Sequence, residues 1–150
     1  TPKVLNSPRV AGGYLRYAAG TVEVAAADDD TSVYRFVRVP SNAVIKSVQV
    51  ACDAITGGTD YNIGIYRTAA DGGAVVSDNL FGDAINLSSA LAFTDVTYET
   101  TATNIASVAK ELWELAGLSA DPNTYYDICA TGIAVGSGAG TISMRVEYTA

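Results

Sequence analysis

Histidine is absent from the 150-residue sequence, and cysteine is nearly so. Without histidine, Ser-His-Asp and Cys-His nucleophile activation and His-ligated metal sites are impossible. The two cysteines, Cys52 and Cys129, lie far apart and form no Cys-x-x-Cys motif. Each sits in a β-like apolar run, so we expect buried free thiols. A disulfide is the less favoured alternative, because nothing in the sequence marks secretion.

Positive charge and long apolar runs are also scarce. The sequence has 9 Lys and Arg against 16 Asp and Glu, which gives a net charge of −7. Such a chain repels phosphate backbones and anionic lipids, so we expect neither nucleic acid nor a membrane as partner. No apolar run approaches the roughly 18 residues that span a bilayer, and the N-terminus lacks the apolar block of a signal peptide. We therefore expect a soluble protein.

The composition predicts an ordinary globular fold, since 49% of the residues are hydrophobic and 17% are charged. A chain of this length is typical of one domain, over residues 1–150. β-Branched and aromatic residues recur in short bursts separated by turn residues, a pattern typical of an all-β fold. We expect a jelly-roll-like antiparallel β-sandwich of eight strands, over residues 14–17, 21–25, 33–39, 44–54, 61–66, 93–99, 125–131 and 141–148.

Alternation of side chains predicts which strand faces are buried. The strand over Val44–Ala54 has a clean apolar face and should line the core. The strand over Val33–Val39 is less clear, because neither of its faces is purely apolar. Tyr34, Phe36 and Arg38 are expected on one face, with Arg35 on the other. This mixture favours an interface, or an arginine whose stem lies over apolar surface.

One segment has helical rather than β spacing. Apolar residues from Ile105 to Ala116 recur at helical intervals, Asn104 can cap the start, and Gly117 can end the helix in the left-handed conformation. We expect one short α-helix, about residues 105–116, that covers an end or a face of the sandwich. A second, weaker helical turn is expected over residues 78–83.

The remaining segments give no chemical signature. Residues 1–12 contain two prolines and little alternation, so we expect an extended N-terminal arm. Gly136–Gly140 leads into a strand and predicts a hairpin turn rather than a phosphate-binding loop. Asp28–Asp30 lacks EF-hand spacing and predicts a solvated loop tip rather than a cation site. We expect no catalytic residue, no metal site and no cofactor, and hence not an enzyme.

Several β-like stretches together resemble a known group of proteins. They are Tyr34–Ala43, Thr59–Tyr66 and Ala139–Tyr148, with Leu112–Leu118 in addition. From about Gly20 onward, the chain resembles small structural proteins of tailed bacteriophages, and in particular the decoration (cement) proteins that bind the outside of an icosahedral head. The resemblance implies a jelly-roll-like sandwich that sits as a small oligomer across capsomer junctions. It brings no catalytic residues with it.

The resemblance also implies partners and a location. The partners are the major capsid protein of a tailed phage and further copies of the chain, with a dimer favoured over a trimer. The location is the outer capsid surface of the virion, after synthesis in the bacterial cytoplasm. As candidate capsid contacts we take arm residues: Lys3, Val4, Leu5 and Arg9. As candidates for self-association we take residues of the mixed strand: Tyr34, Arg35, Phe36 and Arg38.

A ligand-binding module is the alternative, such as a carbohydrate-binding sandwich of a tail fibre or of another virion component. The sequence has nine tyrosines, which could supply an aromatic surface for a sugar. Its only tryptophan, Trp113, falls on the expected amphipathic helix, which argues against an exposed stacking platform.

Overall fold

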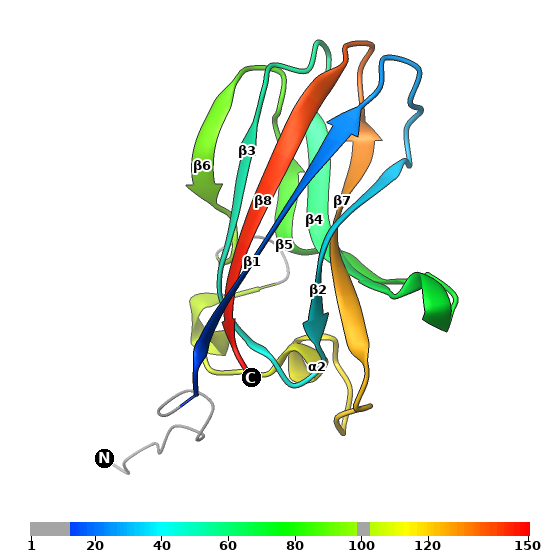
Figure 1. The fold of residues 1–150 in the computed structure, drawn as a ribbon. Helices are drawn as coiled ribbons and strands as arrows, with labels where there is room; N and C mark the ends of the chain where they lie inside the picture. Colours follow the sequence, from blue (N-terminus) through cyan, green and yellow to red (C-terminus); the bar gives the residue numbers. More distant parts are fainter. Residues whose placement is uncertain (1–12, 99–102) are drawn as a thin grey trace.

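The computed structural model describes residues 13–98 and 103–150, which form two four-stranded sheets packed face to face (Figure 1). All neighbouring strands in both sheets run antiparallel. The strands are β1 (Leu15–Val24), β2 (Val33–Pro40), β3 (Val44–Cys52), β4 (Asp60–Arg67), β5 (Val75–Ile85), β6 (Leu91–Asp95), β7 (Tyr125–Ala134) and β8 (Gly140–Thr149). The described helical elements are all short: η1 (Ala69–Asp71), η2 (Ile105–Ser107) and α2 (Leu112–Leu115).

The order of the strands is that of a jelly roll. Sheet A has the order β1-β8-β3-β6, and sheet B has the order β2-β7-β4-β5. Apart from the β4–β5 hairpin, each connection takes the chain from one sheet to the other. Eight strands joined in this way make the double-sheet jelly roll. The predicted all-β, jelly-roll-like antiparallel sandwich is therefore confirmed.

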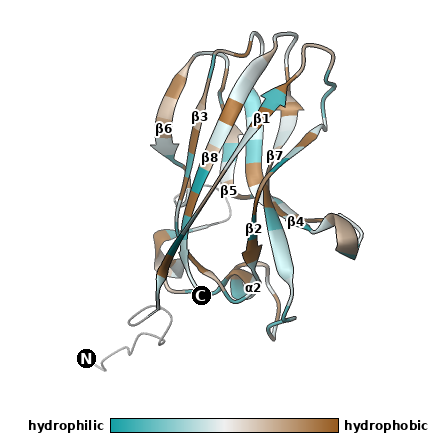
Figure 2. Cartoon of the chain, in the orientation of Figure 1, coloured by the Kyte–Doolittle hydropathy of each residue, from teal (hydrophilic) through white to brown (hydrophobic). Residues whose placement is uncertain are grey.

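The core lies between the two sheets and is filled by alternate residues of their strands. Figure 2 shows hydrophobic and hydrophilic segments alternating along β8, as expected for a strand with one face inward. The predicted inner face of β3 is confirmed, since Val48 and Val50 are completely buried. The largest side chains without exposed surface include Tyr61, Phe81, Ile128 and Met144.

The two ends of the sandwich are formed by different elements. The β1–β2, β3–β4, β5–β6 and β7–β8 connections meet at one end, here called the loop end, which is uppermost in Figure 1. There the backbone N–H of Ile55 donates to the carbonyl of Leu87 at 3.0 Å. The opposite end, here called the helix end, holds α2, and the N–H of Leu112 donates to the carbonyl of Ala43 at 2.8 Å. The start of β1 and the end of β8 also lie at the helix end (Figure 1).

The predicted number of strands, eight, is right, but the predicted strands do not all correspond to the observed ones. The strands expected over residues 14–17 and 21–25 are a single strand, β1, which runs straight through Gly20. Glycine is required there, because a Cβ at this position would overlap the carbonyl of Phe36 in β2. The strand expected over residues 93–99 is β6, which begins at Leu91, and residue 99 lies outside the described residues.

The helical turn expected over residues 78–83 is wrong, because this segment belongs to β5. The register between β4 and β5 is irregular, with Ile63 opposite Gly82 but Ile65 opposite Ser77. The extra residues of β5 bring Leu80 and Phe81 into the core. Burial of these two side chains accounts for the apolar spacing that suggested a helix.

The predicted helix over residues 105–116 is also wrong in its extent. It is broken into η2 and the four-residue α2, with an extended residue, Glu111, between them. Glu111 and Glu114 form a reciprocal capping box that starts α2 afresh. Ile105 and Val108 are exposed, so no packing holds the first half in an α-helix. The predicted cap at Asn104 is present, but it caps η2.

The prediction of two free, buried thiols is confirmed. Cys52 and Cys129 are both free and buried. Burial raises the pKa of the Cys129 thiol to about 12. The hairpin turn predicted at Gly136–Gly140 is wrong, because this stretch joins β7 of sheet B to β8 of sheet A, and the two strands do not pair with each other. Among the described residues, no helix has both the length and the apolar character needed to cross a membrane.

Candidate interaction surfaces

A β-bulge in β2 changes which way the residues predicted for self-association face. The pairing register with β7 shifts between Arg35 and Val37. One inserted residue reverses the alternation of side chains beyond it. Tyr34 and Val37 therefore both point into the core, with 6% and 7% of their surfaces exposed. The predicted grouping of Tyr34 with Phe36 and Arg38 on one face is wrong for this reason.

Tyr34 and Phe36 both take part in the packing of the sandwich. The Tyr34 hydroxyl donates to Oδ2 of Asp28 at 2.9 Å, and burial, with a contribution from Asp28, raises the pKa of this tyrosine. Phe36 is half-buried against the core, and its backbone lies against Gly20 of β1. Tyr34 therefore has no side-chain surface to offer a second copy, and Phe36 offers only part of its own.

Arg35 and Arg38 lie on the outer face of sheet B, where both donate to Asp127 of β7. The bond from Arg35 Nη1 to Oδ2 is 2.9 Å long, and the bond from Arg38 Nε to Oδ1 is 2.8 Å long. Arg35 also donates to the carbonyls of Arg67 at 2.9 Å and Gly73 at 3.0 Å. Hydrogen bonding to Asp127 raises the pKa of Arg38. Arg35 thus ties the β4–β5 hairpin to β2.

The same cluster borders a shallow groove of about 300 Å³. Its lining residues are Arg35, Phe36, Val37, Arg38, Ala69 and Asp127. The Asp127 side chain is only 7% exposed, whereas that of Arg38 is 54% exposed. Because intramolecular acceptors already occupy Arg35, Arg38 is the member of the cluster with surface left for a partner.

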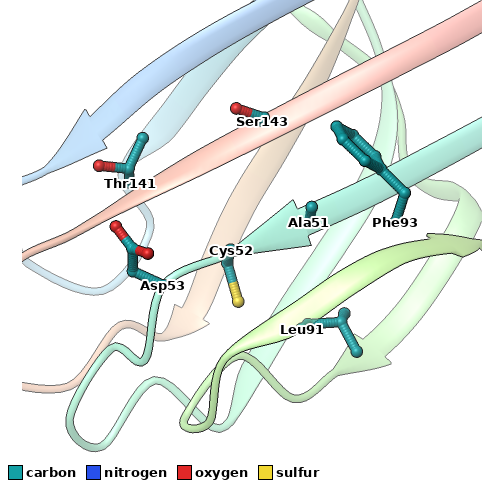
Figure 3. A pocket seen from close by; sticks show the side chains of 7 residues that line it. All are labelled: Ala51, Cys52, Asp53, Leu91, Phe93, Thr141 and Ser143. Carbon is teal, nitrogen blue, oxygen red and sulfur yellow. The ribbon is translucent and has the colours of Figure 1, made fainter.

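A second groove, of about 280 Å³, lies on the outer face of sheet A between β3, β6 and β8 (Figure 3). Its lining residues are Ala51, Cys52, Asp53, Leu91, Phe93, Thr141 and Ser143. The guanidinium of Arg145 lies 3.6 Å from the centre of the Phe93 ring, so one face of this ring is covered. Ser143 and Thr141 are hydrogen-bonded to side chains of β1. The groove is a small surface of mixed polar and apolar character, and its one aromatic ring is partly covered.

The aspartates at the loop end are used by the fold itself. Oδ2 of Asp28 accepts from the backbone N–H of Ala25 at 2.9 Å as well as from Tyr34. Oδ1 of Asp30 accepts from the backbone N–H of Val135 at 3.0 Å. Over residues 13–98 and 103–150, no group of three His, Cys, Asp or Glu residues could hold a metal ion.

Exposed apolar side chains gather at the start of β1. Tyr14, Leu15 and Tyr17 are 85%, 64% and 61% exposed. These residues are not among the candidates chosen from the sequence, although three large apolar side chains within four positions were a visible signal. Further exposed apolar residues follow β6 in the chain or begin β7: Ile105, Val108, Leu118 and Tyr125.

The predicted capsid contacts cannot be placed in the same way. Lys3, Val4, Leu5 and Arg9, with the whole arm over residues 1–12, lie outside the described residues. The described chain starts at the helix end, where Leu15 pairs with Thr149.

Comparison with known proteins gives a likeness of fold. No family model and no curated protein matches the sequence. Among solved structures, the chain is similar to a chain of the cyanophage Pam1 capsid asymmetric unit, with a TM-score of 0.54 and 16% sequence identity. The likeness covers 92% of this chain and 86% of that chain, so it extends over nearly the whole sandwich.

Proposed function

We propose that the chain is a structural protein of a phage virion, and specifically a decoration protein on the outer surface of an icosahedral head. In this role it binds the major capsid protein and stabilises the junctions between capsomers. The proposed role requires no catalysis and no cofactor.

One observation gives the proposal its main support. The fold of this jelly-roll chain is similar, over 92% of its length, to that of a chain from a phage capsid. The motifs Tyr34–Ala43, Thr59–Tyr66 and Ala139–Tyr148, on which the resemblance to decoration proteins rests, form parts of β2, β4 and β8. The sequence resemblance and the likeness of fold therefore involve the same strands.

The proposed mechanism is multivalent clamping. Each oligomer holds two or more capsid subunits, so that separating those subunits also requires breaking the contacts with the oligomer. Linked contacts gain effective concentration, and each one can therefore be weak. The arm over residues 1–12 precedes the described chain at the helix end, and twelve residues can reach at most about 40 Å. The helix end, from which the arm departs, is then the end of each sandwich that lies nearest its capsid contact.

Virions of the phage that carries the chain provide the test. The chain is expected to co-sediment with mature heads and to be absent from purified tails. Deleting residues 1–12 should weaken binding to heads, and Lys3→Glu with Arg9→Glu should do the same. The control is Asp29→Asn with Asp53→Asn, two exposed residues at the loop end, which should bind as the wild type does. Undiminished binding of the deletion variant would remove the arm from the mechanism, and presence only in tails would overturn the decoration role.

The carbohydrate-binding alternative has less support from the described surfaces. The indole N–H of Trp113 donates to Glu111 at 2.7 Å, and the Phe93 ring is partly covered by Arg145. Trp113 fluorescence that changes on addition of one member of a glycan panel would favour this alternative.

A further inference from the structure

A β-sandwich has four edge strands, and three of those in this fold carry features that discourage pairing with another chain. β2 contains the bulge at Phe36 and ends at Pro40. β5 pairs irregularly with β4, and its Leu80 carbonyl accepts from Thr103. β6 has only five residues. Bulges, prolines and short length are the usual means by which proteins protect exposed sheet edges.

The fourth edge strand, β1, has none of these features. Its ten residues pair with β8 without a register shift, and they include neither proline nor lysine. No described residue outside β8 forms a backbone hydrogen bond with β1. Its second half is shielded where Gly20 lies against Phe36, but the first half is exposed on both faces of the sheet. The segment Tyr14–Ala19 is therefore an open, regular sheet edge.

We propose that this edge binds the same edge of a second copy of the chain, as an antiparallel β1–β1 pair around a two-fold axis. Antiparallel pairing of identical edge strands is self-complementary, since each residue contacts its partner in the same way in both copies. The backbone groups of the free edge then become paired, and Tyr14, Leu15 and Tyr17 of the two copies pack together on either side of the joined sheet.

Charge favours a second copy at this edge over other parts of the surface. The whole chain carries a net charge of −7, so two copies repel each other over most approaches. β1 contains one cation, Arg16, and one anion, Glu23, and is neutral as a strand. Within the open segment Tyr14–Ala19 the only charged residue is Arg16, so no carboxylate of this segment faces the partner strand. The edge is thus a place where copies can meet without strong repulsion.

The area available fits a weak dimer. The exposed parts of Tyr14, Leu15 and Tyr17 amount to roughly 400 Å² per copy, taking about 150–250 Å² for a whole aromatic side chain. Two copies, with the strand backbone added, approach the lower limit of about 1,200 Å² for specific interfaces. We therefore expect a dimer that dissociates at micromolar concentration rather than an obligate one.

This inference is independent of capsid binding, although it supplies what the proposed function needs. A β1–β1 dimer carries two copies of the arm, which leave the paired strands in opposite directions, and it could hold two capsid subunits at once. It also moves self-association away from β2, where Tyr34 is buried and Arg35 is already bound. Failure to dimerise would leave head binding by single copies possible, so the two proposals fail separately.

The test is sedimentation velocity of the whole chain from about 1 μM to about 1 mM, the span of weak affinities. The wild type should shift from monomer to dimer as concentration rises. Tyr17→Lys, with or without Leu15→Lys, should raise the dissociation constant at least tenfold, because lysine on a sheet edge opposes pairing. Val75→Lys is the matched control at the edge of sheet B, where the side chain is 57% exposed, and should dimerise normally.

A second measurement tests proximity rather than affinity. With the two-fold axis at Tyr17, near the middle of the open segment, the two copies of this residue lie opposite each other, so Tyr17→Cys should form a disulfide-linked dimer under mild oxidation. Val75→Cys should stay monomeric on denaturing gels. A wild type that stays monomeric throughout, or a dimer that Tyr17→Lys does not weaken, would overturn the proposal, as would equal cross-linking of the two cysteine variants.

Discussion

Replacing Asp127 with asparagine tests whether the arginine cluster on sheet B holds the fold together or holds a second copy. The carboxylate is nearly buried and accepts from Arg35 at 2.9 Å and from Arg38 at 2.8 Å. The asparagine side chain would keep the shape but lose the charge, and its amide N–H groups would face one of the two guanidinium groups while its oxygen still accepts from the other. If the cluster is structural, the variant should unfold more easily without any change in oligomeric state.

The magnitude follows from the bond to Arg35. A hydrogen bond to a charged group contributes about 1.5–3 kcal/mol, and breaking a fully buried ion pair costs about 3–5 kcal/mol. The lower range applies, because the Arg35 side chain is 33% exposed. For a chain of this size, a loss of about 1.5–3 kcal/mol lowers Tm by roughly 3–12 °C.

Thermal unfolding by circular dichroism, with sedimentation alongside, provides the assay. The control is Asp71→Asn, which breaks the exposed pair between Arg67 and Asp71 at 3.6 Å. Such surface pairs contribute about 0–1 kcal/mol, so this variant should have nearly the wild-type Tm. The reasoning is refuted if Asp127→Asn is no less stable than Asp71→Asn, or if it changes the oligomeric state while Tm stays constant.

Two further predictions concern buried positions. Gly64→Ala should lower the free energy of unfolding by about 1–3 kcal/mol in urea titration, because the added Cβ would overlap the backbone of Ser77 and Asp78; a neutral result would show that β5 can move aside. Burial raises the Cys129 pKa from 9.0 to about 12, so its contribution to stability is complete below about pH 9 and lost as pH rises toward 12. Cys129→Ala should therefore flatten the fall of unfolding free energy above pH 9 by up to about 1.4 kcal/mol per pH unit, and an unchanged slope would contradict this assignment.

The sequence was sufficient to predict the fold where one face of a regular strand is buried. In β3, the two-residue period of Val48, Val50 and Cys52 identifies the inner face directly. In β7, the adjacent Tyr125 and Tyr126 had to face opposite ways, and Tyr126 is indeed the buried one. These positions depend only on local alternation, which the sequence carries in full.

The errors occur where distant parts of the chain decide the local geometry. The bulge at Phe36 occurs where Gly20 of β1 lies close to the β2 backbone. The residues near Phe36 in the sequence do not indicate this bulge. The irregular pairing of β5 places Leu80 and Phe81 in the core at a spacing that resembles a helical turn. The shared face predicted for Tyr34, Phe36 and Arg38 is wrong because the bulge reverses the alternation beyond it.

The open edge of β1 could have been found from the sequence only in part. Tyr14, Leu15 and Tyr17 were visible as a cluster, but their exposure on both faces depends on β1 being an edge strand. Strand order is a property of the whole topology, which the alternation pattern does not encode. The sequence therefore predicted the fold better than it predicted the open edge of β1.

The jelly-roll order makes the two poles unequal as attachment points. A peptide inserted at the exposed residues Ser89 and Ala90 would project from the loop end, opposite the start of β1 and the end of β8, and would leave β1 untouched. Insertion near Gly136 would be less tolerated, because that turn is packed against the Thr56 carbonyl. A tag fused after Ala150 would emerge beside Leu15 and obstruct it. Display libraries and purification handles for this scaffold therefore belong at the β5–β6 turn.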